Sequence, residues 1–210
     1  MTTIPANMLL AFDTSSAACT VALFDADGAC LASRDEQIGR GHAERLVPMI
    51  DEVLAGRKAN RILVGVGPGS FTGIRVAIAA AHGLAIGWNA ELKGMSSLAL
   101  LAAGAATDGE VAAAVTGGHG ELFVQQFDAL TLKSTSELLN LPPQAAAGAI
   151  SARLVVGSGA KPLIDARGWG EAREAWPSAA HALSLPEAQR SLPSRPIYAR
   201  APDARVSKAA

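Results

Sequence analysis

The chain has 210 residues, of which 50% are hydrophobic and 18% charged, and its formal net charge is −1. This length predicts one domain or a pair of lobes with a substantial buried core, and the composition excludes an intrinsically disordered chain. The near-neutral charge argues against a protein that holds nucleic acid by itself, because phosphate binding depends on clustered Lys and Arg.

The first part of the chain predicts a three-stranded antiparallel meander. A short apolar run at residues 9–13 is followed by a hydroxyl-rich turn and by two alternating segments on either side of an Asp-Gly turn. In this hairpin Cys19 faces approximately Arg34 and lies too far from Cys30 for a disulfide. We therefore expect two free thiols that are buried or half-buried.

An amphipathic helix is expected next. Its apolar residues recur at helical spacing and form one stripe. The stripe comprises Leu46, Val47, Ile50, Val53 and Leu54. Because Pro48 lies inside it, the helix either begins near Val47 or bends at the proline.

Residues 62–66 predict a short buried strand, and residues 67–73 form a glycine-rich turn. A second helix is expected at 74–88, and a third at 95–106. The second helix is apolar on most sides and poor in charge, so something must cover it.

Residues 107–109 are the best candidate for a boundary between lobes. Strands are expected after this boundary at 111–115, 122–127 and 154–157. Beyond residue 160 the periodicity is weak. We expect a mixed α/β chain with lobes at 1–107 and 108–200 and a loose tail at 201–210.

The sequence predicts no membrane span and no membrane partner. Its most apolar region, residues 76–106, is interrupted by charged residues and glycines, whereas a span needs about 20 nearly uninterrupted apolar residues. The first residues also lack the features of a signal peptide. We therefore expect a cytoplasmic protein.

Two turns contain candidate phosphate-binding residues. The glycine-rich turn permits close backbone approach, and the helix start after it can attract an anion, although a turn of this kind also needs glycine simply to bend. The acidic and hydroxyl residues after the first strand can hold a phosphate or hydrated Mg²⁺, or can serve as an ordinary turn. The candidates are Asp13, Thr14, Ser15, Gly67, Gly69 and Ser70.

No catalytic residue and no metal ligand is predicted. The histidines at 42, 82, 119 and 181 have no metal-ligand spacing. The chain also contains no Gly-x-Ser-x-Gly nucleophile motif.

Three motifs together resemble the TsaB (YeaZ) family, whose members take part in tRNA threonylcarbamoyladenosine biosynthesis. They are Leu-Leu-Ala-Phe-Asp-Thr-Ser at 9–15, His-Ala-Glu-Arg-Leu-Val-Pro-Met-Ile at 42–50 and Gly-Pro-Gly-Ser-Phe-Thr-Gly-Ile-Arg at 67–75. The resemblance is dense over residues 8–106. It implies an actin-like, sugar-kinase-like (ribonuclease H-like) fold of two lobes, of which the second is reduced here.

The resemblance also implies a function. It implies a non-catalytic scaffold subunit that supports the catalytic transferase TsaD, together with the ATPase TsaE. The complex makes N6-threonylcarbamoyladenosine beside the anticodon of tRNAs that read codons starting with A. The chain would reach tRNA only through the complex and would have no cofactor of its own, with ATP or ADP at the complex junction.

The first and second helices would form the surface that meets TsaD or a second copy of this chain. The implied interface residues are His42, Leu46, Ile50, Val53, Phe71, Thr72, Arg75, Ile78 and His82.

Two other functions are weighed against this one. An actin-like ATP-dependent phosphotransferase acting on a small molecule would use Asp13 and the glycine turn. It also needs a catalytic aspartate in the second lobe, where Asp108, Asp128 and Asp165 are candidates. A peptidase would need zinc ligands, which the sequence does not supply.

Overall fold

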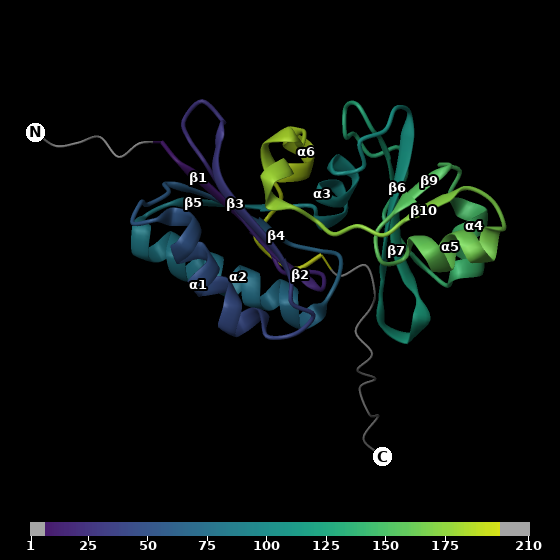
Figure 1. Ribbon diagram of the computed structural model, residues 1–210, viewed down its shortest axis with the longest axis horizontal. Coiled ribbons are helices and arrows are strands. Elements are labelled where there is room, and N and C mark those ends of the chain that lie inside the picture. Colours follow the sequence, from purple (N-terminus) through teal and green to yellow (C-terminus); the bar gives the residue numbers. More distant parts are fainter. Residues whose placement is uncertain (1–6, 198–210) are drawn as a thin grey trace, which may run out of the picture.

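Two five-stranded sheets lie side by side in the computed structural model, which describes residues 7–197 (Figure 1). The first sheet has the order β3-β2-β1-β4-β5. Its strands are β1 (Leu9–Asp13), β2 (Ala18–Phe24), β3 (Cys30–Gln37), β4 (Arg61–Gly65) and β5 (Glu91–Met95). The first three are antiparallel, as the meander predicts, and β4 and β5 extend the sheet in parallel.

Helices α1 (His42–Leu54) and α2 (Phe71–Trp88) cover one face of this sheet. α2 is the crossover between the parallel strands β4 and β5. α1 begins at His42, so the alternative start near Val47 is wrong. The helix runs through Pro48 because the packing of its apolar stripe outweighs the backbone hydrogen bond that proline cannot donate.

The second sheet repeats the topology of the first in smaller form. Read as β8-β7-β6-β9-β10, it also has an antiparallel meander followed by two parallel strands. Its strands are β6 (Glu110–Thr116), β7 (Leu122–Asp128), β8 (Leu139–Leu141), β9 (Leu154–Val156) and β10 (Glu171–Arg173). Helices α4 (Pro143–Ala149) and α5 (Ala160–Arg167) take the positions of α1 and α2. This architecture confirms the predicted two-lobed fold with a reduced second lobe.

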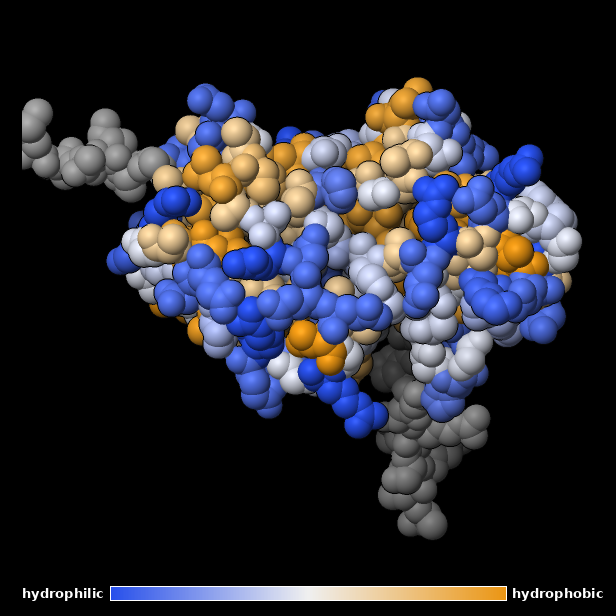
Figure 2. Space-filling view, in the orientation of Figure 1, coloured by the Kyte–Doolittle hydropathy of each residue, from blue (hydrophilic) through white to orange (hydrophobic). Residues whose placement is uncertain are grey.

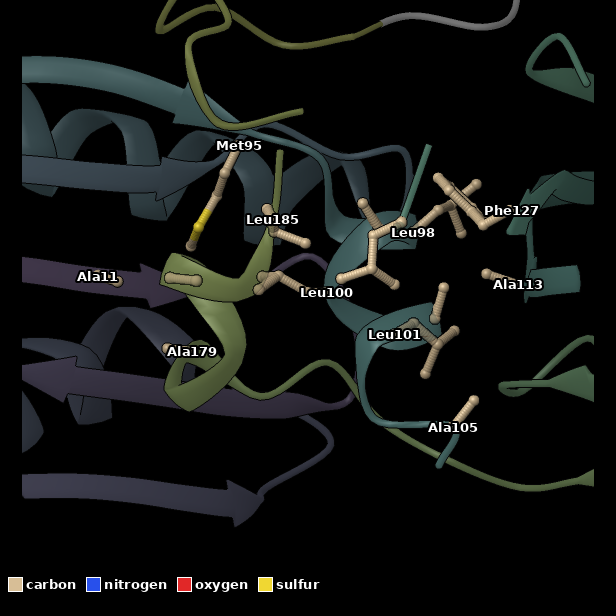
Figure 3. Close-up of a cluster of buried hydrophobic side chains, with 14 of the residues drawn as sticks. Ala11, Met95, Leu98, Leu100, Leu101, Ala105, Ala113, Phe127, Ala179 and Leu185 are labelled. Carbon is tan, nitrogen blue, oxygen red and sulfur yellow. The ribbon is translucent and has the colours of Figure 1, made fainter. Parts of the chain in front are cut away.

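Helix α3 (Ser97–Ala103) joins the two sheets through one continuous hydrophobic core. Figure 3 shows Leu98, Leu100 and Leu101 of α3 between Ala11 of the first sheet and Phe127 of the second. All five side chains are at most 1% exposed. The lobes therefore share buried apolar surface.

The last described segment returns to the first sheet. The short helices η2 (Ala179–Ser184) and α6 (Glu187–Arg190) lie on the sheet face opposite α1 and α2. The backbone of Gly94 pairs with Leu192, and the amide of Ile197 donates to the carbonyl of Val66. Residues 178–197 thus pack on the first sheet, and the tail expected at 201–210 lies outside the described residues.

Several predicted details are corrected by the structure. Cys19 faces Glu36 rather than Arg34, because a register shift near Phe24 lengthens the hairpin turn. Cys19 is buried, whereas Cys30 is exposed on the edge strand β3, and both thiols are free. The third helix begins at residue 97 rather than 95, because residues 91–95 form a strand.

Candidate functional site

The first candidate site is the pair of turns proposed for phosphate binding, which the fold brings together. Asp13 is fully buried at the end of β1, and its Oδ2 accepts a hydrogen bond of 2.5 Å from the Ser97 hydroxyl. Ser97 Oγ in turn accepts the amide N–H of Gly67, and the Ser97 amide donates to the Gly67 carbonyl. Ser97 lies 84 residues after Asp13 and 30 residues after Gly67, and it therefore links the two turns.

The glycine turn also packs directly on the backbone of Thr14 and Ser15. The Thr14 hydroxyl donates to the Gly73 carbonyl at 2.7 Å, and the Ser70 amide donates to the Ser15 carbonyl at 2.6 Å. A Cβ atom at Gly73 would lie 1.9 Å from the Thr14 carbonyl oxygen. Glycine is needed here because no side chain fits between the two backbones.

This geometry favours a structural role for both turns. Asp13, Thr14 and Ser15 are buried, and their polar side-chain or backbone atoms bond within the chain. Ser70 is exposed, but its hydroxyl caps α2 by accepting the Gly73 amide. Phosphate binding by this group stays a prediction, and Ser97 is the member that the sequence did not assign to the two turns.

The second candidate site is the outer surface of α1 and α2, and here the structure corrects part of the prediction. Leu46, Ile50 and Val53 are buried against the first sheet. An apolar stripe packed on its own sheet cannot meet a partner. These three residues are therefore core residues, and the interface role predicted for them is wrong.

The other predicted interface residues lie on or near the surface. Phe71, Thr72, Arg75 and His82 are exposed, and Ile78 is half-buried. The Arg75 guanidinium stacks over the Phe71 ring at 3.6 Å. The His82 Nε2 atom lies 3.3 Å from the carbonyl oxygen of Ser194, in the returning C-terminal segment.

His42, at the start of α1, is half-buried. Its Nε2 atom has no hydrogen-bond partner among residues 7–197.

α2 leaves an apolar, small-residue surface uncovered in the described structure. Its 18 residues have a mean hydropathy of 1.3, which satisfies the length and composition of a membrane span, yet only 22% of them are buried. This differs from the predicted absence of a span, because the window at 71–88 contains just one charged residue, Arg75. α2 packs on β4 as a crossover helix, so its buried side belongs to the core of the first lobe.

We call this surface the helix face. It comprises Val47 of α1 and Phe71, Arg75, Ala79, Gly83 and Ile86 of α2. Val47 is 58% exposed and Ile86 is 83% exposed. Figure 2 shows hydrophobic residues among hydrophilic ones in the region where Figure 1 places α1 and α2.

The second-lobe aspartates that a phosphotransferase would need are engaged locally or exposed. Asp128 accepts two hydrogen bonds from Thr131 in its own turn, which hold the pKa of its carboxyl below the ordinary value. Asp165 pairs with Lys161 on the surface of α5. Asp108 is exposed in the segment between the sheets.

Comparisons with known proteins agree on one family. Residues 34–145, just over half of the chain, match the family model for TsaD, tRNA N6-adenosine threonylcarbamoyltransferase. The tRNA threonylcarbamoyladenosine biosynthesis protein TsaB of Escherichia coli is 37% identical over 129 residues, which are 57% of this chain and 54% of that protein. TsaB of Haemophilus influenzae is 40% identical over 99 residues, 45% of this chain and 41% of that protein. The chain thus spans about half the length of these curated relatives.

Solved structures resemble nearly the whole chain. A Pseudomonas aeruginosa protein described as similar to peptidase YEAZ superposes with a TM-score of 0.76 at 31% identity, covering 92% of this chain and 100% of that one. YeaZ from Pseudomonas aeruginosa gives a TM-score of 0.76 at 29% identity, with coverages of 91% and 99%.

Proposed function

This chain belongs to the TsaB/YeaZ family of TsaD-like proteins, and from this membership we propose that it is a non-catalytic subunit in the synthesis of N6-threonylcarbamoyladenosine in tRNA. Its role is to bind and support the catalytic subunit TsaD. The modification falls beside the anticodon of tRNAs that read codons starting with A. The protein works in the cytoplasm, where these tRNAs are found.

The helix face is the observation that carries this proposal. An exposed apolar side chain such as Ile86 is ordinary on its own, but here it continues a row of small and apolar positions along one side of an 18-residue helix. Ala79 and Gly83 let the backbone of another helix approach closely. A helix pair from TsaD fits such a surface.

The same face supports a homodimer when TsaD is absent. Because one surface cannot bind two partners at once, TsaD and a second copy of this chain compete for it. ATPase TsaE joins the assembled pair, and ATP or ADP occupies the junction. With a net charge of −1, the chain contributes little to tRNA phosphate binding and reaches tRNA through the complex.

Light scattering after size exclusion tests the proposal, with this chain alone and mixed with TsaD of the same organism. Ala79→Arg places a long cation on the exposed side of α2 and is expected to abolish a one-to-one complex. The matched control is Leu130→Arg, at a position 76% exposed in the second lobe, and it is expected to leave the complex intact.

Circular dichroism establishes that both variants are folded. Equal loss of the complex in both variants would show that the loss is not specific to the helix face, and the interface could not be assigned to it. If no complex forms at any salt or nucleotide concentration, the partner assignment fails. ATP turnover by the isolated chain would then support the phosphotransferase instead.

A further inference from the structure

The sheet face opposite the helix face contains a cavity between α6 and the starts of β1, β4 and β5. Its volume is about 110 Å³. Leu9 and Leu63, whose side chains lie on this face of the sheet, contribute to an apolar floor, and charged side chains form the rim. This volume is several times that needed for one water molecule, yet it lies well below the roughly 300–1,000 Å³ of sites for drug-sized ligands. The cavity therefore suits a ligand of only a few heavy atoms.

The rim has an excess of positive charge. It contains the cations Arg61, Lys93 and Arg190 and the anions Glu91 and Glu187. Lys93 Nζ lies 3.2 Å from Glu91 Oε1 and 3.8 Å from Glu187 Oε1, and Arg190 Nε lies 3.5 Å from Glu187 Oε2. Both carboxylates are thus already paired.

Arg61 makes no ion pair within 4 Å among residues 7–197. The surplus charge on this rim is therefore carried by its guanidinium.

Two buried guanidinium nitrogens on this rim make no hydrogen bond among residues 7–197, although one of them, Arg190 Nε, lies 3.5 Å from a carboxylate oxygen of Glu187. The Nε atoms of Arg61 and Arg190 are inaccessible to solvent and have no hydrogen-bond partner in the described part of the chain. A buried donor left unsatisfied costs about 1–3 kcal/mol, and more when the group is charged. Guanidinium groups match the planar fork of a carboxylate or two oxygens of a phosphate. Because the two Nε atoms are inaccessible, an oxyanion in the cavity would bond to the terminal nitrogens of the guanidinium groups, and Arg61, which has no ion pair among the described residues, would gain the most.

We propose that this cavity binds a small metabolite through a carboxylate or phosphate group held by Arg61 and Arg190. The apolar floor would contact the carbon part of the ligand, and Glu187 would fix Arg190 in place. The hydroxyl of Ser191 donates to Glu187 and so helps to hold that carboxylate. Because the cavity and the helix face lie on opposite sides of the first sheet, ligand and protein partner can bind together.

NMR titration of amide signals tests the proposal, with inorganic phosphate and acetate as separate probes in chloride buffer at constant ionic strength. We expect at least one probe to give saturable shifts at residues lining the cavity. Arg61→Gln is expected to weaken that binding at least tenfold. The matched control Arg153→Gln, at an exposed position in the second lobe, is expected to leave it unchanged.

The relative affinities of the two probes identify the anionic group. Arg190→Gln serves as a second test if Arg61→Gln does not fold. Shifts that rise linearly without saturation, or that weaken equally in Arg61→Gln and Arg153→Gln, would overturn the proposal. Binding of a short ribo-oligonucleotide but of neither small probe would also overturn it. None of these outcomes depends on TsaD, so failure here leaves the proposed function untouched.

Discussion

Gly83 offers a sharp test, because stability and partner binding should respond to its replacement in opposite directions. It lies on the exposed side of α2, and a Cβ atom built there would meet nothing within 4 Å. Glycine inside a helix costs about 1 kcal/mol relative to alanine. Gly83→Ala should therefore raise the free energy of unfolding by about 1 kcal/mol, which corresponds to roughly 2–4 °C in Tm for a chain of this size.

Gly83→Leu separates the two effects further. Leucine is nearly as good a helix former as alanine, so the isolated chain should again gain stability. A leucine side chain would stand between α2 and a closely packed partner helix. Overpacking of this kind costs about 1–3 kcal/mol, equivalent to a roughly 5- to 150-fold weaker complex with TsaD.

The assay pairs thermal unfolding of the isolated chain with calorimetric titration against TsaD. Gly87→Leu, also exposed with open space at its Cβ, maps how far the contact extends toward the end of the helix. A lower Tm for Gly83→Ala would refute the reasoning about helix stability. An unchanged affinity for Gly83→Leu would refute close packing at this position.

Two substitutions and one labelling experiment test the core, the turns and the burial of the cysteines. Ile50→Ala should lower the free energy of unfolding by about 2–5 kcal/mol, because Ile50 is 3% exposed. If urea denaturation shows a decrease in the free energy of unfolding of less than about 1 kcal/mol, Ile50 does not contribute to the core. Ser97→Ala removes the hydroxyl that donates to Asp13 and should lower the free energy of unfolding by about 1–3 kcal/mol. Unchanged stability in the same assay would contradict a stabilising role for this hydrogen bond. Burial raises the pKa of the Cys19 thiol from 9.0 to about 12, while Cys30 is exposed. Iodoacetamide at about pH 8.5 should therefore label only Cys30 in the native chain. Two labels by mass spectrometry would disprove this. Since the folded pKa of Cys19 exceeds the unfolded value, its contribution to stability is fully present below pH 9.0 and is lost as the pH rises toward about 12.

The sequence predicts best those elements that have their own hydrophobic pattern. β1 and the apolar stripe of α1 were both predicted, since strand alternation and helical spacing are local signals. β5 was missed because Glu-Leu-Lys-Gly-Met contains no β-branched residue and one glycine. Short helices were expected among the strands of the second lobe, but α4 and α5 were not located because they are short and their apolar side chains are mostly small.

The candidate sites were predicted less completely, for a different physical reason. The amphipathic stripe of α1 shows that one face of the helix is buried, but it does not show what covers that face. Ile50 was assigned to a partner for this reason, although it packs on the chain's own sheet. Ser97 was not assigned to the two turns, because a hydrogen bond to Asp13 across 84 residues leaves no local pattern.

The return of the C-terminal segment has a consequence for synthesis of the chain on the ribosome. Ala179 and Leu185 complete the core over a sheet whose first strand begins at Leu9. At 5–20 residues per second, about 9–35 s separate translation of these two parts. During that interval one face of the nascent first sheet lacks the part of its cover that residues 179–185 supply, so this is the period in which the chain is most open to chaperones and to misassembly.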